Sequence, residues 1–268
     1  AHIQRAQSAR LTLAGHGNFD VNASGTVDQP IVQAKLDIAN IIANGEPIGD
    51  IHLNAVTRGR ELELTGRSQL EQAALAIDGR IQLLGDFPGT ATVHFENLDF
   101  DPVLRAFLQN RVTGHSSMNG RIDFSGPFKR PKLLTIHGNI PELSAQLEKI
   151  ELTNAGPIEF SLVNQVATIQ QLHLRGDGTD IDASGRVNLP DEKLDAAAKG
   201  TLNLKLLEGL GQQDLMSYGT VNMQLTVGGT IRKPVPVGQI TIQDAGIAIL
   251  DLPNGLANIN GTLRYEGR

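Results

Sequence analysis

Apolar and polar residues alternate with a period of two along most of this chain, and no other feature constrains its fold as strongly. Such alternation is typical of a β-strand with one dry face and one wet face. Odd positions carry the apolar residues from Leu75 to Leu83, and even positions carry them from Ile122 to Phe128. The sequence therefore predicts an all-β fold, an antiparallel sheet with one buried side. Turn-forming pairs interrupt the runs about every ten residues, at Asn44-Gly45, Asp78-Gly79, Pro88-Gly89, Asp177-Gly178 and Asn254-Gly255.

Two segments have a helical pattern instead. Asp101 and Pro102 supply an N-cap and a proline at the first helical position, which predicts a short helix reaching Asn110. The segment 205–215 has a weaker helical pattern because two glycines interrupt it. We expect one or two short helices beside the sheet.

Composition narrows the choice of function. Hydrophobic residues make up 40% of the chain but aromatic residues only 4%, so the interior must be built from aliphatic side chains. A core with so few aromatic side chains is small for a globular enzyme. We therefore expect no enzymatic activity. Acidic and basic residues are interleaved around a net charge of -6, so no basic face is available for nucleic acid. The absence of cysteine excludes disulfides and thiolate metal sites.

A sequence motif recurs along the chain. A strand ending in glycine is followed five residues later by proline at Gly25 to Pro30, Gly126 to Pro131 and Gly229 to Pro234. The motif glycines are spaced by 101 and 103 residues. We therefore divide the chain into repeat units 1–125 and 126–228, with the start of a third unit at 229–268. Because the chain begins and ends inside apparent strands, we expect it to be part of a longer protein.

Each repeat keeps the apolar residues on the same face of its strands, so the repeats are predicted to extend one long sheet. About 16 to 18 strands at about 4.8 Å per strand give a sheet on the order of 80 Å long. Its apolar face cannot stay in water, so the sheet must fold over on itself or hold a guest.

These motifs together resemble the repetitive β-rich region of the TamB family of AsmA-like proteins. The resemblance is carried by strings such as Gly120 to Pro131 and Gly219 to Pro234, and by the closing stretch from Gly238 to Tyr265. It covers nearly the whole chain, and its strength lies in repetition because each motif alone is short.

The resemblance implies an elongated antiparallel sheet curled into a hydrophobic groove, sometimes called a β-taco. Such proteins are anchored in the inner membrane of diderm bacteria, cross the periplasm, and pair with an outer-membrane barrel of the TamA or BamA kind. Proposed roles are the transport of phospholipid or another acyl-chain lipid and the assembly of outer-membrane proteins. No catalytic residue or cofactor is implied. The membrane anchor and the docking region for the barrel are expected outside this chain.

The residues expected to line the groove share one face of the predicted strands. Three roles remain open for them: a lipid conduit, a chaperone-like scaffold that adds client strands to a sheet edge, or a structural spacer whose core is filled by the chain itself. The predicted lining residues are Ile81, Leu83, Val93, Phe95, Ile122, Phe124, Ile158, Phe160, Val187, Leu189, Val221, Met223, Leu225, Ile240 and Ile242.

Other candidate sites have simpler interpretations. The segment 176–182 is similar to a calcium-binding glycine-aspartate repeat, but such sites need stacked copies and a turn explains it better. The seven histidines never pair at a metal-ligand spacing, so we expect no metal site. Asp99 and Asp101 are a carboxylate pair that could act in general acid–base catalysis, but helix capping is the better explanation for two carboxylates at this position. The glycines of segment 15–17 lack the rest of a nucleotide-binding fingerprint.

Overall fold

The structure, a computed structural model, describes residues 13–26, 30–43, 46–70, 73–99, 101, 114–147, 150–209, 215–249 and 255–267. Strands make up 82% of the described residues and helix 3%, which confirms the predicted all-β fold. The strands are β1 (Leu13–Gly25), β2 (Pro30–Ala43), β3 (Glu46–Arg58), β4 (Glu61–Leu70), β5 (Ala73–Gln82), β6 (Pro88–Leu98), β7 (Gly114–Pro127), β8 (Thr135–Leu147), β9 (Ile150–Asn154), β10 (Ile158–Val163), β11 (Val166–Gly176), β12 (Thr179–Asn188), β13 (Lys193–Asn203), β14 (Leu215–Thr230), β15 (Lys233–Ile249) and β16 (Leu256–Glu266).

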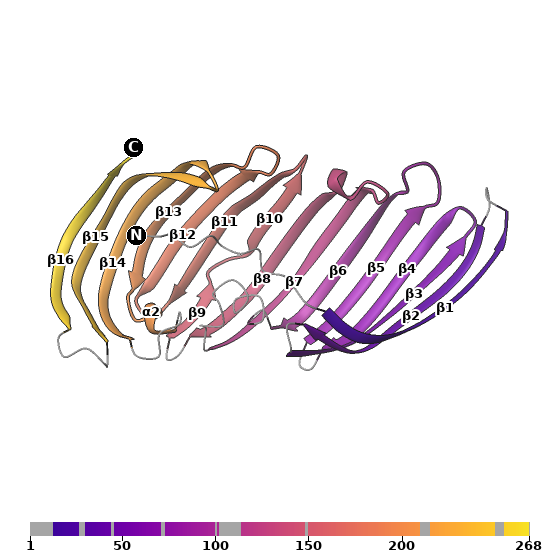
Figure 1. The fold of residues 1–268 in the computed structure, drawn as a ribbon, viewed down its shortest axis with the longest axis horizontal. Helices are drawn as coiled ribbons and strands as arrows, with labels where there is room; N and C mark the ends of the chain where they lie inside the picture. Colours follow the sequence, from indigo (N-terminus) through magenta and orange to yellow (C-terminus); the bar gives the residue numbers. More distant parts are fainter. Residues whose placement is uncertain are drawn as a thin grey trace.

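All the described strands belong to one 16-stranded antiparallel sheet. Each strand pairs with its neighbours in the chain from β1 to β16, except that β9 lies off this path and pairs with β8 and β11. Figure 1 shows the strands side by side along the long axis of an elongated molecule, curling at their lower ends. The predicted elongated, curled antiparallel sheet is therefore confirmed.

Strand register keeps one face of the sheet apolar from β1 to β15. Residues directly opposite each other in an antiparallel pair point to the same face, so a row can be followed from partner to partner across the sheet. Every member of this row is apolar or glycine: Phe19, Leu36, Leu53, Gly66, Ile77, Val93, Ile122, Gly138, Phe160, Ile169, Gly185, Ala196, Val227 and Pro236.

The sheet bends because extra residues are inserted on one side of this row. Register shifts lie toward the lower strand ends, for example after Ile38 in β2, after Phe95 in β6 and after Ile242 in β15. A bulge of this kind bends its strand and increases the local twist. Since the bulges fall on one side of the row, the lower part of the sheet turns over the apolar face and makes it hollow.

At three of these bulges, a side chain of the neighbouring strand accepts a hydrogen bond from the bulged backbone. Asn40, Asn97 and Asp244 have positive φ angles of 53°, 50° and 47°. Each backbone N–H then donates to a side chain on the neighbouring strand, at 2.9 Å to Asp50 Oδ1, 2.7 Å to Asn119 Oδ1 and 2.9 Å to Asn260 Oδ1 respectively. Asn and Asp tolerate this conformation better than other non-glycine residues, so the sequence supports the bulges locally.

The recurring Gly-to-Pro motif ends β1, β7 and β14. Gly25, Gly126 and Gly229 all have positive φ angles, of 87°, 124° and 88°, which a residue with a side chain adopts only with strain. The step from β1 to β7 is six strands along the sheet, and the step from β7 to β14 is again six because β9 lies off the path. The boundaries of the three repeat units stay a prediction.

The helix and turn predictions were partly confirmed. A helix α2 spans Leu206–Gly209, inside the predicted segment 205–215, whereas Leu215 begins β14 and residues 210–214 lie outside the described residues. Of the helix predicted to reach Asn110, only Asp101 lies within the described residues. Asp177 and Gly178 form the predicted turn, whereas Asp78 and Gly79 lie inside β5. None of the described helices is long and apolar enough to span a membrane.

Candidate functional site: the hydrophobic groove

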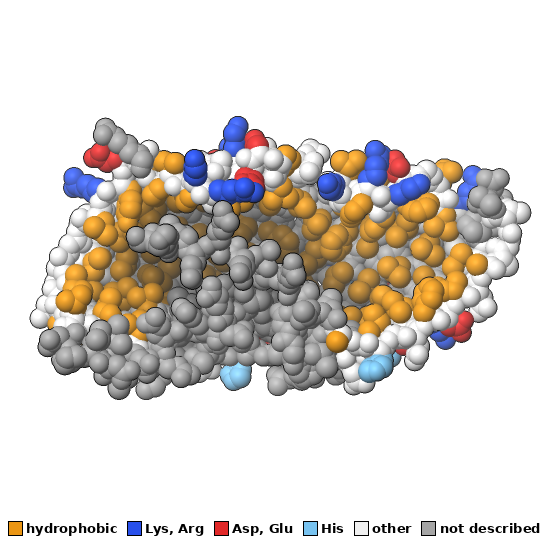
Figure 2. Space-filling model, in the orientation of Figure 1, with side chains coloured by type: hydrophobic (Ala, Val, Ile, Leu, Met, Phe, Trp, Pro, Cys, Tyr) orange, Lys and Arg blue, Asp and Glu red, His pale blue; other side chains and the backbone are white. Residues whose placement is uncertain are grey.

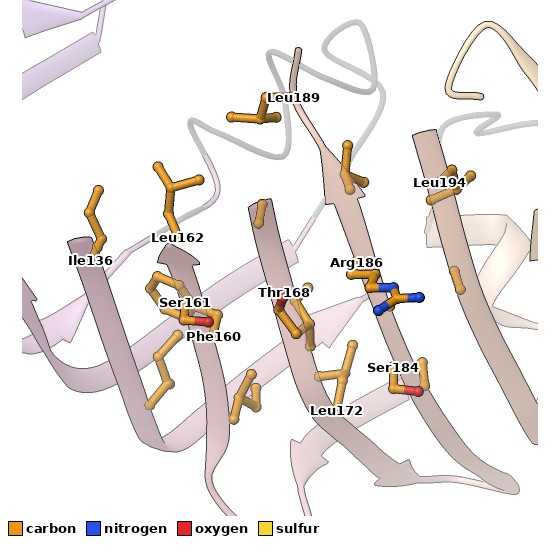
Figure 3. A pocket seen from close by; sticks show the side chains of 18 residues that line it. Ile136, Phe160, Ser161, Leu162, Thr168, Leu172, Ser184, Arg186, Leu189 and Leu194 are labelled. Atoms are coloured by element: carbon orange, nitrogen blue, oxygen red, sulfur yellow. The ribbon is translucent and has the colours of Figure 1, made fainter. Parts of the chain in front are cut away.

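Apolar side chains line the hollow face of the sheet (Figure 2). Between β8 and β13 this face holds a cavity of about 650 Å³ (Figure 3). Its apolar lining comes from five neighbouring strands and the residue after β12: Ile136, Ile140, Ile158, Phe160, Leu162, Ala167, Ile169, Leu172, Ala183, Gly185, Val187, Leu189, Leu194 and Ala196.

Four polar residues also border the cavity. Ser161, Thr168, Ser184 and Arg186 alternate along their strands with apolar lining residues. Because successive side chains of a strand point to opposite faces, these four side chains stand on the outer face and border the cavity with their backbone atoms. The hollow face therefore offers a guest aliphatic surface and almost no polar side chain.

Small residues make room for this cavity. Gly185 lies opposite Ala196, and Ala183 opposite Ala198, so β12 and β13 place no large side chain at these points. On β8 and β10 the ring of Phe160 lies over Gly138, where a Cβ added to the glycine would be only 2.0 Å from the ring. Glycine and alanine at these positions thus leave space between the larger side chains of the groove lining.

The predicted lining residues within the strands all lie on the hollow face. Ile158, Phe160, Val187 and Leu189 line the cavity together, with Leu189 just past the end of β12. Leu83 likewise follows the end of β5. The others reach the same face by cross-strand pairing or by alternation from a paired residue: Ile81, Val93, Phe95, Ile122, Phe124, Val221, Met223, Leu225, Ile240 and Ile242.

The chain itself fills part of this face. Val221 packs with Leu204 and Ala245 in a buried cluster that Met223, Ile240 and Ile242 also contact. Phe95 is buried as well, with its ring over Gly120. These predicted lining residues therefore contribute to packing at least as much as to an open surface.

Elsewhere the face stays open within the described part of the chain. No large side chain among the described residues is fully buried. Ile169 in the middle of the cavity is 43% exposed, Phe19 on β1 is 71% exposed, and Leu263 on β16 is 52% exposed. Aliphatic surface of this extent is unfavourable in water and marks an interaction site.

Sequence reasoning missed part of the lining on β11. Ala167 and Ile169 occupy odd positions, but Leu172 and Leu174 occupy even ones. A register shift between Ile169 and Leu172 returns both pairs to the same face. Because of this shift, the apolar residues of β11 change from odd to even positions, which obscures the alternation. An odd-numbered apolar run followed by an even-numbered one was the sequence signal for a bulge between them.

The outer face carries charged cross-strand pairs. Arg186 and Asp195 lie opposite each other at 3.0 Å, and Lys199 lies 4.0 Å from Asp182. All four side chains are largely exposed or partly exposed, so each pair contributes little to stability. These pairs make the outer face polar, in contrast to the apolar hollow face.

The segment 176–182 is a hairpin, as the simpler interpretation predicted. His173 bonds Asp180 at 2.7 Å and lies 3.5 Å from Asp182. The hydrogen bond with His173 holds the pKa of Asp180 below its usual value, and Arg175 acts in the same direction. Within the described ranges, no three His, Asp or Glu side chains gather in a way that would hold a metal ion.

Asp99 and Asp101 lie together at the lower rim. The backbone N–H of Asp101 donates to Asp99 Oδ1 at 2.8 Å, and the Ser116 hydroxyl donates to both carboxylates. These contacts are structural ones that tie the end of β6 to β7.

Comparison with known proteins found no matching family model, no similar curated protein and no similar solved structure.

Proposed function

We propose that this protein is a non-enzymatic carrier that shields acyl chains of lipids in its hydrophobic groove. The observation that carries the proposal is the unbroken apolar row from β1 to β15 on a hollow face that the described residues fill only in part. A row of this length suits a long aliphatic guest, and the cavity lining offers almost no polar side chain that would select a headgroup.

Physical magnitudes support an acyl chain as the guest. Each buried methylene contributes about 0.8 kcal/mol without any directed contact. The cavity volume of about 650 Å³ lies within the usual range of roughly 300–1,000 Å³ for small-molecule sites. An aliphatic lining with few aromatic rings is sufficient for such a guest, because the hydrophobic effect is non-directional.

The cellular setting of the proposal rests on the resemblance to the TamB family. On that basis we place the protein in the periplasm, as part of a longer chain anchored in the inner membrane. It would support outer-membrane biogenesis, with a barrel of the TamA or BamA kind as its outer partner.

A second candidate function is strand addition to an assembling outer-membrane protein. The edge strands favour it, because β1 and β16 end the described sheet and their side chains are almost all exposed. An edge strand presents unpaired backbone groups that can pair with another strand. Crosslinks from β1 or β16 to a barrel protein, undiminished by charge in the groove, would favour this role.

A pair of neighbouring substitutions tests the lipid proposal. Ile169→Asp places a charge in the middle of the cavity, and Thr168→Asp places the same charge on the outer face one residue away. We expect Ile169→Asp to weaken binding of the apolar dye N-phenylnaphthylamine on the order of tenfold, since a charge is costly beside an aliphatic guest. Thr168→Asp should bind as the unchanged protein does.

Two readouts complete the test. Lipids that co-purify with each protein are identified by mass spectrometry, and circular dichroism reports folding. A self-filled spacer predicts that Ile169→Asp unfolds the protein and that the unchanged protein carries no apolar molecule. Either equal dye binding by both variants or an empty groove in the unchanged protein would contradict the lipid proposal.

A further inference from the structure

The two long rims of the groove differ in charge. We define the upper rim as the described turns that join β3 to β4, β5 to β6, β7 to β8, β10 to β11, β12 to β13 and β14 to β15, together with the strand residue on either side of each turn, at the top of Figure 1. These turns carry twice as many cations as carboxylates: Arg58, Arg60, Lys129, Arg130, Lys132, Lys193, Arg232 and Lys233 against Glu61, Asp86, Asp191 and Glu192.

The described turns of the opposite rim are mainly acidic. They carry Asp99, Asp101, Asp177 and Glu208 against Lys205. In a chain with a net charge of -6, cations therefore predominate on the described turns of one rim and carboxylates on those of the other. Such segregation creates a local field that the net charge of the whole molecule does not reveal.

Half of the upper-rim cations are not paired with carboxylates within the described structure. Arg58, Arg130, Lys193 and Arg232 form ion pairs. No ion pair is found among the described residues for Arg60, Lys129, Lys132 or Lys233, whose side chains are exposed. Their charge is available to an anionic partner.

Exposed apolar side chains lie on the same turns. Leu84 is 59% exposed, Leu133 is 49% exposed and Ile231 is 54% exposed. Phe87 is partly exposed, and the Lys129 ammonium lies 5.7 Å from the centre of its ring. Cations interleaved with exposed leucine, isoleucine and phenylalanine are typical of surfaces that bind the headgroup region of an anionic membrane.

The length of the rim distinguishes a surface from a single small anion. Arg60 lies between β3 and β4, and Lys233 lies at the start of β15. The nine strand steps from β4 to β14 along the sheet correspond to roughly 40 Å at the usual strand spacing. No single phosphate group reaches all of these cations, whereas the surface of a bilayer does.

We propose that the upper rim is a docking surface for a bilayer containing anionic phospholipid, with its cations at the headgroup phosphates and its exposed apolar side chains among the headgroups. The cations and exposed apolar side chains named for this surface do not line the cavity, and the surface does not depend on lipid carriage. Docking would hold the open face of the groove beside the membrane.

Vesicle co-sedimentation tests the proposal. The protein is mixed with vesicles of phosphatidylcholine alone or of phosphatidylcholine with phosphatidylglycerol, at low and high salt. We expect binding only to the anionic vesicles, weakened by salt because exposed charges are screened. The triple variant Lys129→Glu, Lys132→Glu, Lys233→Glu should bind on the order of 100-fold more weakly, since each basic residue near the surface contributes about 1 kcal/mol.

A matched variant makes the same charge change away from the rim. Lys35→Glu, Lys199→Glu and Arg264→Glu alter exposed residues within β2, β13 and β16, and together they should leave vesicle binding within a few-fold of the unchanged protein. A third variant, Leu84→Ser, Leu133→Ser, Ile231→Ser, should weaken the part of the binding that survives high salt. Circular dichroism verifies that each variant is folded.

Several outcomes would overturn the docking surface. Equal binding to neutral and anionic vesicles would do so, as would equal losses in the rim variant and its matched control. A rim variant that keeps vesicle binding but loses soluble dihexanoyl phosphatidylglycerol would assign the cations to the headgroup of a lipid held in the groove. Ile169→Asp should retain vesicle binding, so failure of the groove proposal is distinguishable from failure of this one.

Discussion

At the scale of single residues, close contacts between backbones explain why certain strand positions are glycine. A Cβ added at Gly200 in β13 would lie 2.0 Å from the carbonyl oxygen of Asp180 in β12, and Gly200 has a φ of 133°. By contrast, a Cβ added at Gly17 in β1 meets nothing within 4 Å. The two glycines occupy strands, but only one of them is required by its surroundings.

This difference leads to a prediction. Gly200→Ala should lower the free energy of unfolding by about 1–3 kcal/mol, because it strains φ and pushes β12 and β13 apart. Gly17→Ala should be neutral or slightly stabilising, since alanine is favoured over glycine inside a strand by roughly 0.5–1 kcal/mol. Urea unfolding of the two variants measures both values, and equal effects would contradict the backbone contact.

Which face a residue occupies could largely be predicted from the sequence at this scale. Val93 and Ile122, or Phe124 and Ile158, belong to regular runs in which the period of two alone assigns the face. The exposed fraction of each side chain could not be predicted, because it depends on strands that are distant in the sequence. Phe95 is buried while Ile169 is open, although both continue the same apolar pattern.

At the scale of elements, β9 and α2 pack together at the lower end of the groove. Ile150 and Leu152 of β9 pack with Leu206 of α2, and these three side chains are 3%, 8% and 5% exposed. Leu202 of β13 packs against them. A short strand outside the main path thus joins a four-residue helix to the sheet.

We therefore expect Leu206→Ala to be costly. It should lower the free energy of unfolding by about 2–5 kcal/mol, as for other large-to-small changes in a packed core. Ile169→Ala on the open face should cost clearly less, because this side chain is 43% exposed. Thermal or urea unfolding provides the comparison, and a larger effect at Ile169 would show that the groove is its own core.

The sequence predicts strands better than their ends. Asp78 and Gly79 have the composition of a turn, yet they continue β5, because Gly79 faces Ala91 closely across the sheet. A turn glycine and a close-contact glycine look alike in one sequence. Burial around α2 shows a similar limit, because the contacts of Leu204 and Leu206 with neighbouring strands cannot be read from the helical pattern of the segment alone.

At the scale of the whole molecule, strands contact their neighbours in the sheet and little else in the described structure. Stability in such an arrangement is a sum of local interfaces. Strands in the middle of the path have a partner on both sides, whereas β1 and β16 have one.

Amide hydrogen exchange should reflect this arrangement. We expect the strongest protection in β7 to β13 and progressively weaker protection toward β1 and β16, since the edge strands open at lower free energy than the centre. Exchange followed by mass spectrometry resolves the gradient. Uniform protection that is lost in one cooperative step would contradict it.

The sequence predicted the extent of the sheet, at 16 to 18 strands, but not the way in which it curves. The extent follows from counting alternating runs, and the described residues form 16 strands. The curvature depends on where inserted residues fall relative to one another in neighbouring strands, and a single run carries no such information.

The bulges near Asn40, Asn97 and Asp244 have a consequence for any guest. Since the bend is set by the backbone and held by hydrogen bonds between neighbouring strands, it does not need contents to persist. Under the proposed function, the groove would therefore load and release its guest without refolding.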